Sequence, residues 1–193
     1  ALTRIGGVLI QLVEIPGLIE GANADRGGGR ALLGVLRNAD AVVYCHEAIA
    51  PLDSLVVVRT EVVTAGIELP AVLALTKADE VAPERIDELR RSVDLEVVAV
   101  SILDDASLDE LRQAIWRLTG LIRVWLHHDG EVDPRPQPMH AGATVADVAD
   151  RVHHELGATA PGARIWGVSA RFDGQRVGRD HVVQDGDTVE VLR

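Results

Sequence analysis

The stretch LVEIPGLIEGA, residues 12–22, is the one from which we predict the organisation of the chain. It follows on from an apolar run, residues 7–13, and this run predicts a buried strand of a parallel sheet. In α/β folds, ligands bind at the carboxyl ends of such strands. Glu14 stands at that end, where a carboxylate can hold the water shell of a bound Mg²⁺ ion. Pro16 and Gly17 end the strand and let the backbone turn close to a phosphate.

Composition limits the classes of protein to consider. The chain has 193 residues, enough for one or two domains, and 47% of them are hydrophobic. We find no run of about eighteen apolar residues and no charged leader with an apolar segment, so neither a membrane partner nor secretion is expected. The single cysteine, Cys45, fits a reducing cytoplasm. The net charge of −11 argues against a broad nucleic-acid surface and against DNA as a partner, but it allows a local basic patch.

Strand-like and helix-like segments alternate in the first 120 residues, which predicts a parallel sheet of βαβ units. At Leu121 this rhythm changes to short strands, a proline-rich loop and one helix. We therefore predict two domains, 1–120 and 121–193. In the first domain we expect a hairpin with its turn at 6–7, strands at 41–45, 71–75 and 96–100, and helices at 31–38, 53–65, 83–91 and from a capping box at 107–110.

A second polar stretch, Thr76-Lys77-Ala78-Asp79, directly follows an apolar run. A carboxylate at position 79 can accept hydrogen bonds from guanine N1 and the exocyclic amine, a donor pair that adenine lacks. The stem of Lys77 can lie over a purine while its ammonium group reaches backbone oxygens. Lys77 is the only lysine of the chain. The alternative is an ordinary loop with a solvated Lys-Asp pair.

These stretches together resemble motifs of a GTPase family. The sequence PGLIEGA, residues 16–22, is similar to the third motif, Asp-x-Pro-Gly, of the Obg and developmentally regulated GTP-binding (Drg) group, with Glu14 in the place of Asp. Residues 76–79 resemble the fourth motif, Asn-Lys-x-Asp, and Ser101-Ile102 resembles the fifth, Ser-Ala-x. The resemblance implies a partial Ras-like P-loop GTPase core. It also implies that GTP or GDP is bound by Thr76, Lys77, Asp79, Ser101 and Gly17, with Mg²⁺ held through water by Glu14.

The phosphate-binding sequence Gly-x-x-x-x-Gly-Lys-Ser/Thr does not occur in the chain. In the family the absent segment also includes the strand that lies between the one ending at Glu14 and the one ending near Cys45. Those two strands therefore pair directly, or something else fills the sheet, or the chain is a fragment. We expect a fragment or a decayed descendant of a GTPase, with weak nucleotide binding, no catalytic residue of its own and no self-sufficient hydrolysis.

The second domain has the order strand, loop, helix, strand, strand, which predicts a ubiquitin-like β-grasp. Thr144 is the expected N-cap of its helix, with Asp147 in the capping position and Gly157 as the stop. The sequence ARIWGVSARFDGQRVGRDHVVQDGDTVEV, residues 163–191, is similar to the TGS domain that ends Drg-type GTPases. This resemblance implies a unit that docks on RNA, the ribosome or a regulatory partner protein.

A second hypothesis is accordingly a non-catalytic TGS module that docks on such a partner. A basic cluster suits a phosphate backbone, and the alternative is an ordinary solvated face. Trp125 and Trp166 could stack on a base, or simply pack at the rim of the core. The adjacent histidines 127–128 and 153–154 diverge on a strand or a helix, so we expect no metal site there. The expected contact residues are Arg164, Arg171, Gln175, Arg176, Arg179 and His181.

Overall fold

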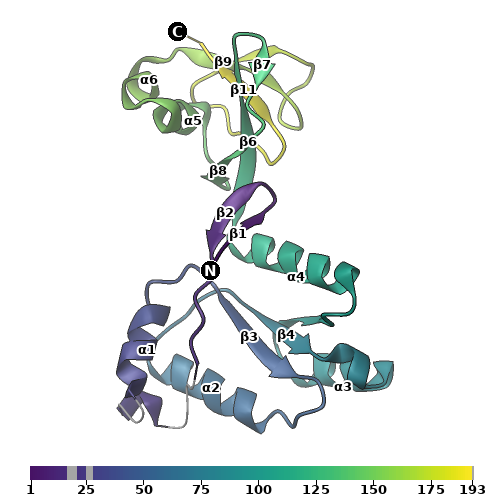
Figure 1. Cartoon of the computed structure of the whole chain (residues 1–193). Coiled ribbons are helices and arrows are strands. Elements are labelled where there is room, and N and C mark those ends of the chain that lie inside the picture. Colours follow the sequence, from purple (N-terminus) through teal and green to yellow (C-terminus); the bar gives the residue numbers. More distant parts are fainter. Residues whose placement is uncertain (17–20, 25–27, 193) are drawn as a thin grey trace. The chain divides into compact units, whose positions relative to one another are not determined.

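A computed structural model describes residues 1–16, 21–24 and 28–192 of the chain (Figure 1). The chain divides into two compact units. One is Leu12–Thr119, the α/β unit, and the other joins Ala1–Gln11 to Gly120–Arg193, the C-terminal unit. The first eleven residues thus pack with the C-terminal part of the chain.

The α/β unit has a parallel sheet of order β3-β4-β5, in which Val42 lies opposite Ala71 and Val72 lies opposite Glu96. The expected α/β class with a parallel sheet is confirmed. The described elements of this unit are η1 (Ala22–Ala24), α1 (Gly29–Leu36), β3 (Val42–Glu47), α2 (Asp53–Thr64), β4 (Ala71–Thr76), η3 (Ala78–Glu80), α3 (Pro83–Ser92), β5 (Glu96–Ala99) and α4 (Asp105–Leu118).

Strand β4 is the centre of this unit because both of its faces are covered. Alternate residues point to opposite faces of a strand. Leu73 and Leu75 pack with side chains of α2 and α3, whereas Val72 and Ala74 pack with side chains of α4. Figure 1 shows α4 on one side of the sheet, and α2 and α3 on the other. The sheet therefore holds the loops after β4 and β5 on a buried support.

The apolar run 7–13 is not a buried strand of this sheet, so that prediction is wrong. Among the described residues, β2 (Val8–Gln11) pairs only with β1 (Leu2–Ile5), antiparallel, through a turn at Gly6 and Gly7 with φ of 57° and 85°. Leu9 and Val13 are 55% and 57% exposed. A strand is buried on both faces only where neighbouring layers cover it. In the described part of the chain, β2 and β3 do not pair, so the outer edge of β3 lies open.

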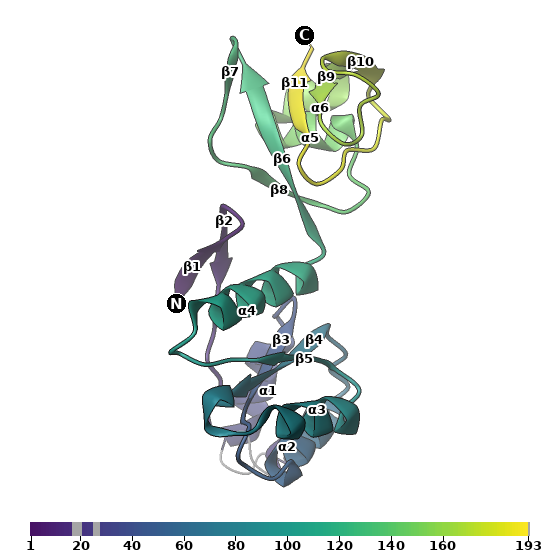
Figure 2. The same cartoon turned by 90° about the vertical axis from the view of Figure 1, so that its right-hand side faces the viewer.

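The C-terminal unit is a β-grasp, as predicted. Its main sheet has the order β10-β9-β11-β6-β7, with β8 also paired to β6, and β6 runs parallel to β11 (Figure 2). The core lies between this sheet and α5 and includes Val124, Val148, Ile165 and Val189. The elements are β6 (Leu121–His128), β7 (Glu131–Val132), β8 (Gln137–His140), α5 (Val145–Val152), α6 (His154–Thr159), β9 (Gly162–Trp166), β10 (Gln175–Gly178) and β11 (Thr188–Val191).

The predicted capping box is present at the start of α5. The Asp147 amide donates to Thr144 Oγ1 at 3.3 Å, and the Thr144 amide donates to Asp147 Oδ2 at 2.7 Å. The predicted stop at Gly157 is wrong, since α5 ends at Val152 and Gly157 lies inside α6. A Cβ atom at Gly157 would lie 2.6 Å from Asp150 Cβ, so glycine here permits a close approach between two helices. None of the described helices is long and apolar enough to cross a membrane.

Candidate functional site

The loops that follow β4 and β5 lie side by side. The Val100 amide donates to Leu75 O at 2.8 Å, and the Ala78 amide donates to Val100 O at 3.1 Å. Because parallel strands end at the same edge of their sheet, these bonds hold the loop of Asp79 against the loop of Ser101. The structure thus brings together four of the predicted nucleotide residues: Thr76, Lys77, Asp79 and Ser101.

Lys77 adopts a left-handed backbone conformation, with φ 55° and ψ 38°, directly after β4. Its Nζ lies 2.6 Å from Glu47 Oε1 at the end of β3, and both side chains are about half exposed. The hydrogen bond and charge of Glu47 raise the pKa of Lys77. Neighbouring Thr76 donates its hydroxyl to His46 O at 3.3 Å. The ammonium group therefore lies on a carboxylate in this structure, while the stem stays exposed.

Asp79 stands in the short helix η3 and is exposed. Within the described parts of the chain its carboxylate accepts no hydrogen bond. A carboxylate with both oxygens open to solvent can accept from two neighbouring donors at once. Asp79 therefore has the chemistry and the accessibility that recognition of a guanine edge requires.

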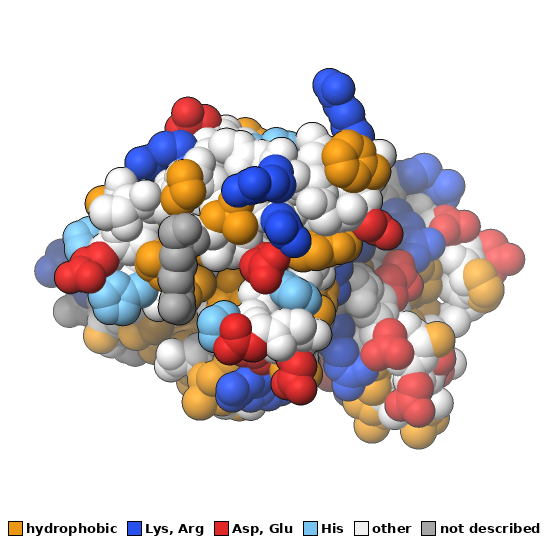
Figure 3. All heavy atoms as spheres, turned by 90° about the horizontal axis from the view of Figure 1, so that it is seen from above, with side chains coloured by type: hydrophobic (Ala, Val, Ile, Leu, Met, Phe, Trp, Pro, Cys, Tyr) orange, Lys and Arg blue, Asp and Glu red, His pale blue; other side chains and the backbone are white. Residues whose placement is uncertain are grey.

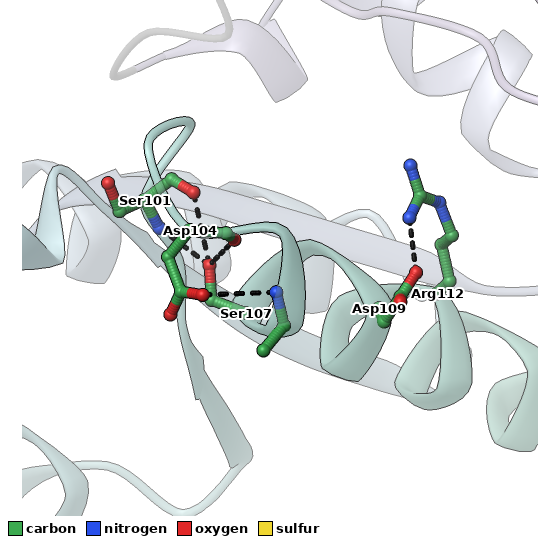
Figure 4. Close-up of polar contacts among 6 residues, drawn as sticks. Ser101, Asp104, Ser107, Asp109 and Arg112 are labelled. Atoms are coloured by element: carbon green, nitrogen blue, oxygen red, sulfur yellow. Dashed lines mark hydrogen bonds and ion pairs between the residues drawn. The ribbon is translucent and has the colours of Figure 1, made fainter.

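Ser101 is buried, and its neighbours occupy its polar groups (Figure 4). Its amide donates to Ser107 Oγ at 3.0 Å, and its own Oγ accepts from the Leu103 amide at 3.1 Å. Among the described residues, the amide of Ile102 has no such partner, and its side chain is 87% exposed. A ligand at this loop would therefore meet the Ile102 N–H rather than that of Ser101.

The same network corrects the predicted start of α4. Ser107 is not the N-cap, because α4 begins at Asp105 and the Asp104 carboxylate accepts from the Ala106 amide at 3.0 Å. The Ser107 hydroxyl lies 2.8 Å from Asp104 O and 3.1 Å from Ser101 O, so it braces the loop instead (Figure 4). Asp104 was the missed signal, since aspartate caps a helix as well as serine does.

Glu14 is exposed in the segment that follows β2, while Gly17 lies outside the described residues. The pKa of the Cys45 thiol is raised, mainly by burial and to a lesser extent by the charge of Glu14. Since Cys45 lies in β3, Glu14 lies near that strand. Ile15 packs against a cluster that includes Leu33 and Val62 and so anchors the segment. In the described regions no three His, Cys, Asp or Glu side chains gather as metal ligands. A single carboxylate fits only an ion whose other ligands are water and phosphate oxygens.

The predicted contact residues of the C-terminal unit do not share one surface. Arg179 donates to Gly157 O and Ala158 O at 2.8 and 3.0 Å, at the end of α6. His181 lies 3.0 Å from Ser169 Oγ, and Gln175 accepts from the amide of Arg171. Arg164 and Arg176, in contrast, are direct partners on β9 and β10. Figure 3 shows basic side chains scattered among hydrophobic and acidic ones rather than in one continuous patch.

A row of side chains crosses the face of the sheet opposite α5, and the sequence had not revealed that its members lie together. Val124, Ile165 and Val189 face the core, so the residues that alternate with them face outward. His127 and Glu190 stand one residue beyond the paired Leu126 and Val189. The row consists of His127, Glu190, Arg164 and Arg176, with Trp125, Thr188 and Trp166 beside it.

The contacts within this row are loose. The rings of His127 and Trp166 are 4.9 Å apart at 36°. His127 Nδ1 is 3.5 Å from Glu190 Oε1 and, among the described residues, is a buried nitrogen without a hydrogen-bond partner. Glu190 Oε2 lies 4.0 Å from Arg164 Nε. The face therefore offers aromatic rings and guanidinium groups that are only weakly engaged with one another.

Comparison with known proteins identifies a domain family in this chain and several relatives of the whole chain. Residues 122–193 match the TGS domain family, so the C-terminal unit contains a TGS domain. The chain is 26% identical to an uncharacterized GTP-binding protein of Halobacterium salinarum, covering 96% of this chain and 70% of that one. It is 27% identical to an uncharacterized GTP-binding protein of Methanocaldococcus jannaschii, covering 99% and 69%. It is 21% identical to developmentally-regulated GTP-binding protein 1 of Xenopus laevis, covering 100% and 71%. The relatives of this chain are thus GTP-binding proteins of the Drg type.

The matched stretches span 261 and 271 positions in the two archaeal relatives, more than the 193 residues of this chain. Both relatives therefore carry residues within the match that have no counterpart here. Among solved structures, a YchF GTPase of Schizosaccharomyces pombe aligns with a TM-score of 0.45 and 9% identity. That alignment covers 74% of this chain and 48% of the YchF chain.

Proposed function

We propose that this chain is part of a GTP-binding regulatory protein of the Obg/Drg type and that its α/β unit recognises guanine. The observation that carries the proposal is the bond from the Ala78 amide to Val100 O, which holds the exposed Asp79 beside the Ser101 loop. The similarity of the whole chain to proteins named as GTP-binding supports it.

Recognition follows from the exposed groups of the two loops. The Asp79 carboxylate accepts from guanine N1–H and the exocyclic amine, and the Ile102 amide faces the O6 atom. The stem of Lys77 covers one face of the purine. Its ion pair with Glu47 is a half-exposed surface contact, and such pairs cost little to rearrange. The loops therefore need no large change to accept a base.

Phosphate binding is the weak part of the site. GTP or GDP would meet the segment Glu14–Gly17, with Glu14 holding Mg²⁺ through water, but the only lysine, Lys77, belongs to the base loop. Lysine and backbone amides of a phosphate loop normally supply much of the binding and the charge stabilisation for hydrolysis. We therefore expect this chain to bind guanine nucleotides weakly and not to hydrolyse GTP by itself. The single cysteine fits a cytoplasmic setting.

Titration with a GTP analogue labelled on its ribose tests the guanine site. Wild type should show saturable binding in the micromolar range, with GTP competing better than ATP. Asp79→Ala should weaken binding by about tenfold or more, because a charge-assisted pair of hydrogen bonds is lost. Asp79→Asn should favour xanthosine triphosphate, since an amide can donate to the oxygen that replaces the amine of guanine.

Asp94→Ala is the matched control, because Asp94 is an exposed carboxylate of the same unit that meets only Arg59, at 3.3 Å. It should bind the analogue like wild type. No saturation at high concentration, or equal competition by ATP, would contradict guanine recognition by this chain.

A second function, docking of the TGS domain on single-stranded RNA, is favoured by the row on the outer sheet face. Aromatic side chains accept stacked bases, and arginines hold phosphates. Trp125 and Trp166 provide the rings, and Arg164 and Arg176 lie next to them. The ribosome, as a source of exposed RNA, and a regulatory partner protein are the other partners expected for such a domain.

The RNA hypothesis predicts salt-sensitive binding of a short unstructured oligonucleotide. The double variant Arg164→Ala/Arg176→Ala should weaken this binding and reduce its salt dependence by about two phosphate contacts. Arg85→Ala/Arg112→Ala, an equal charge change in the α/β unit, serves as control. If neither RNA nor ribosomes associate with the wild-type chain at low salt, while a protein partner does, the face is not an RNA surface.

A further inference from the structure

An open cavity of about 500 Å³ lies between the N-terminal hairpin and the loop before β8, entirely within the C-terminal unit. The hairpin contributes Arg4, the loop contributes Asp133, Arg135 and Gln137, and α5 contributes Arg151. Both views of the chain show the hairpin next to β8 (Figures 1 and 2). The volume is in the range of small-ligand sites in proteins.

The hairpin wall is packed firmly against the rest of the unit. Ile5 and Val8, which flank the turn, are only 3% and 6% exposed. A Cβ atom at Gly7 would lie 3.0 Å from the ring of Pro136, and one at Gly6 would lie 3.2 Å from Arg123 Nη1. Gly7 therefore lets the turn lie directly on the loop, Gly6 lets it lie against the side chain of Arg123 on β6, and the cavity has two defined walls.

The charge of the cavity is unusual for this chain. Three arginines face one carboxylate here, whereas the chain as a whole carries 30 acidic and 19 basic residues. Arg4 donates to Gly7 O at 3.2 Å, a contact that leaves its charge uncompensated. Arg135 lies 3.8 Å from Asp133 and its side chain is 76% exposed. Arg151 has no ion-pair partner among the residues that the structure describes.

Three guanidinium groups around one cavity repel each other unless an anion lies between them. A phosphate group matches them best, because its oxygens accept the paired N–H groups of guanidinium in a bidentate way. The side-chain amide of Gln137 can donate a further hydrogen bond. We propose that this cavity binds a phosphate group, carried by either a small phosphorylated molecule or the backbone of RNA.

This proposal is independent of the guanine site, which lies in the other unit. The hairpin is nevertheless followed directly by the segment that contains Glu14, since β2 ends at Gln11. A ligand in the cavity would thus contact the hairpin of β1 and β2, which is followed directly by the stretch that resembles the third GTPase motif.

Calorimetric titration of the whole chain with inorganic pyrophosphate and with UDP tests the proposal. UDP carries no guanine, so its binding does not depend on Asp79. Wild type should bind both probes saturably, and Arg135→Ala and Arg151→Ala should each weaken binding by about tenfold, as expected for the loss of a charge-assisted contact. Arg91→Ala is the control, because Arg91 is an exposed arginine of α3 that does not line the cavity and carries the same charge.

An eight-residue oligouridylate added to the pyrophosphate complex identifies the source of the phosphate. Displacement of pyrophosphate assigns the site to RNA, and failure to displace it assigns the site to a small phosphorylated molecule. Absence of saturable binding of all three probes up to millimolar concentration would overturn the proposal. Equal weakening by Arg91→Ala would overturn it too, since binding would then depend only on net charge. Unchanged thermal unfolding of the variants confirms that they are folded.

Discussion

Asp187 of the C-terminal unit and Asp79 of the α/β unit use their carboxylates in opposite ways. In the C-terminal unit, aspartates hold the backbone: Asp187, fully buried, accepts from the Ser169 and Gln184 amides, and Asp185 accepts from the amide and side chain of Arg123. In the α/β unit, Asp79 and Glu14 are exposed, and among the described residues neither accepts such a bond. An aspartate that satisfies buried amides is needed for the fold. One that stays open is available to a ligand.

The two sheets are covered differently. In the β-grasp sheet, α5 covers one face and the other face carries the outward row. In the parallel sheet of the α/β unit, helices cover both faces of β4. Each unit thus has a core of its own, so we expect each to unfold by itself.

The largest expected effect comes from removing one large core side chain in each unit. Ile165 and Leu73 are both fully buried, and replacing either by alanine should cost about 3 kcal/mol of the free energy of unfolding of its own unit. Urea unfolding followed by tryptophan fluorescence separates the two, since Trp125 and Trp166 report on the C-terminal unit and Trp116 on the α/β unit. If Ile165→Ala shifted the unfolding transition reported by Trp116 as much as those reported by Trp125 and Trp166, the two units would unfold together and would not have independent cores.

A smaller effect is expected where a glycine allows close packing at the start of α1. A Cβ atom at Gly29 would clash with the Cα atom of Ala22, so Gly29→Ala should destabilise the α/β unit by about 1–3 kcal/mol. Gly34→Ala, in the same helix with nothing within 4 Å, should stabilise it by about 0.5–1 kcal/mol. Thermal unfolding measures both, and equal effects of the two changes would show that the Ala22 contact does not matter.

The capping box of α5 should contribute less. Thr144→Ala removes its side-chain acceptor and should lower the stability of the C-terminal unit by about 1 kcal/mol. Thr60→Ala serves as control, because the Thr60 hydroxyl only bonds back to Val56 O within α2 and alanine favours helix there. Circular dichroism during urea unfolding measures the stability of both variants. If Thr144→Ala were as stable as wild type, the cap would not be needed.

The smallest effect is a dependence on pH in the C-terminal unit. The Arg123 guanidinium lowers the pKa of Asp185, and the Thr144 amide lowers that of Asp147, from an ordinary value of 3.8. A lowered pKa stabilises the folded state above the unfolded pKa, and this stability is lost as the pH falls through the folded pKa. Both groups are largely exposed, so we expect a loss of only a few tenths to about 1 kcal/mol between pH 5 and pH 2.

Asp185→Asn should flatten that pH profile, because its side chain does not titrate. Its stability at neutral pH should fall toward the value that wild type reaches in acid. A variant whose acid sensitivity equals that of wild type would show that Asp147 or other groups cause the effect.

Several features followed from local sequence alone. Thr144 and Asp147 define a helix start through bonds within one turn, and Pro83 begins α3 at a first-turn position. The runs at 71–75 and 96–100 predicted two strands of the parallel sheet, and Thr76 to Asp79 predicted a loop at the end of the first of them. These succeed because each depends on residues that are only a few positions apart in the sequence.

Other features depended on contacts between distant residues. The run 7–13 looks like a buried strand, but which strands lie next to it decides its burial, and β1 is its only partner among the described residues. Asp104 rather than Ser107 caps α4 because Ser107 bonds the Ser101 loop. The row from His127 to Arg176 exists only through the register of four strands, which no local pattern encodes.

The two-part composition of this chain, the β-grasp of its second part and the loop directly after strand β4 could all be predicted from the sequence. Tertiary structure alone decided that the hairpin packs with the C-terminal unit, that Asp79 is open while Asp187 is buried, and that three arginines meet around one cavity. The reason is physical: alternation, capping and turn signals act over a few residues. Burial and the meeting of like charges are set by which distant segments pack together.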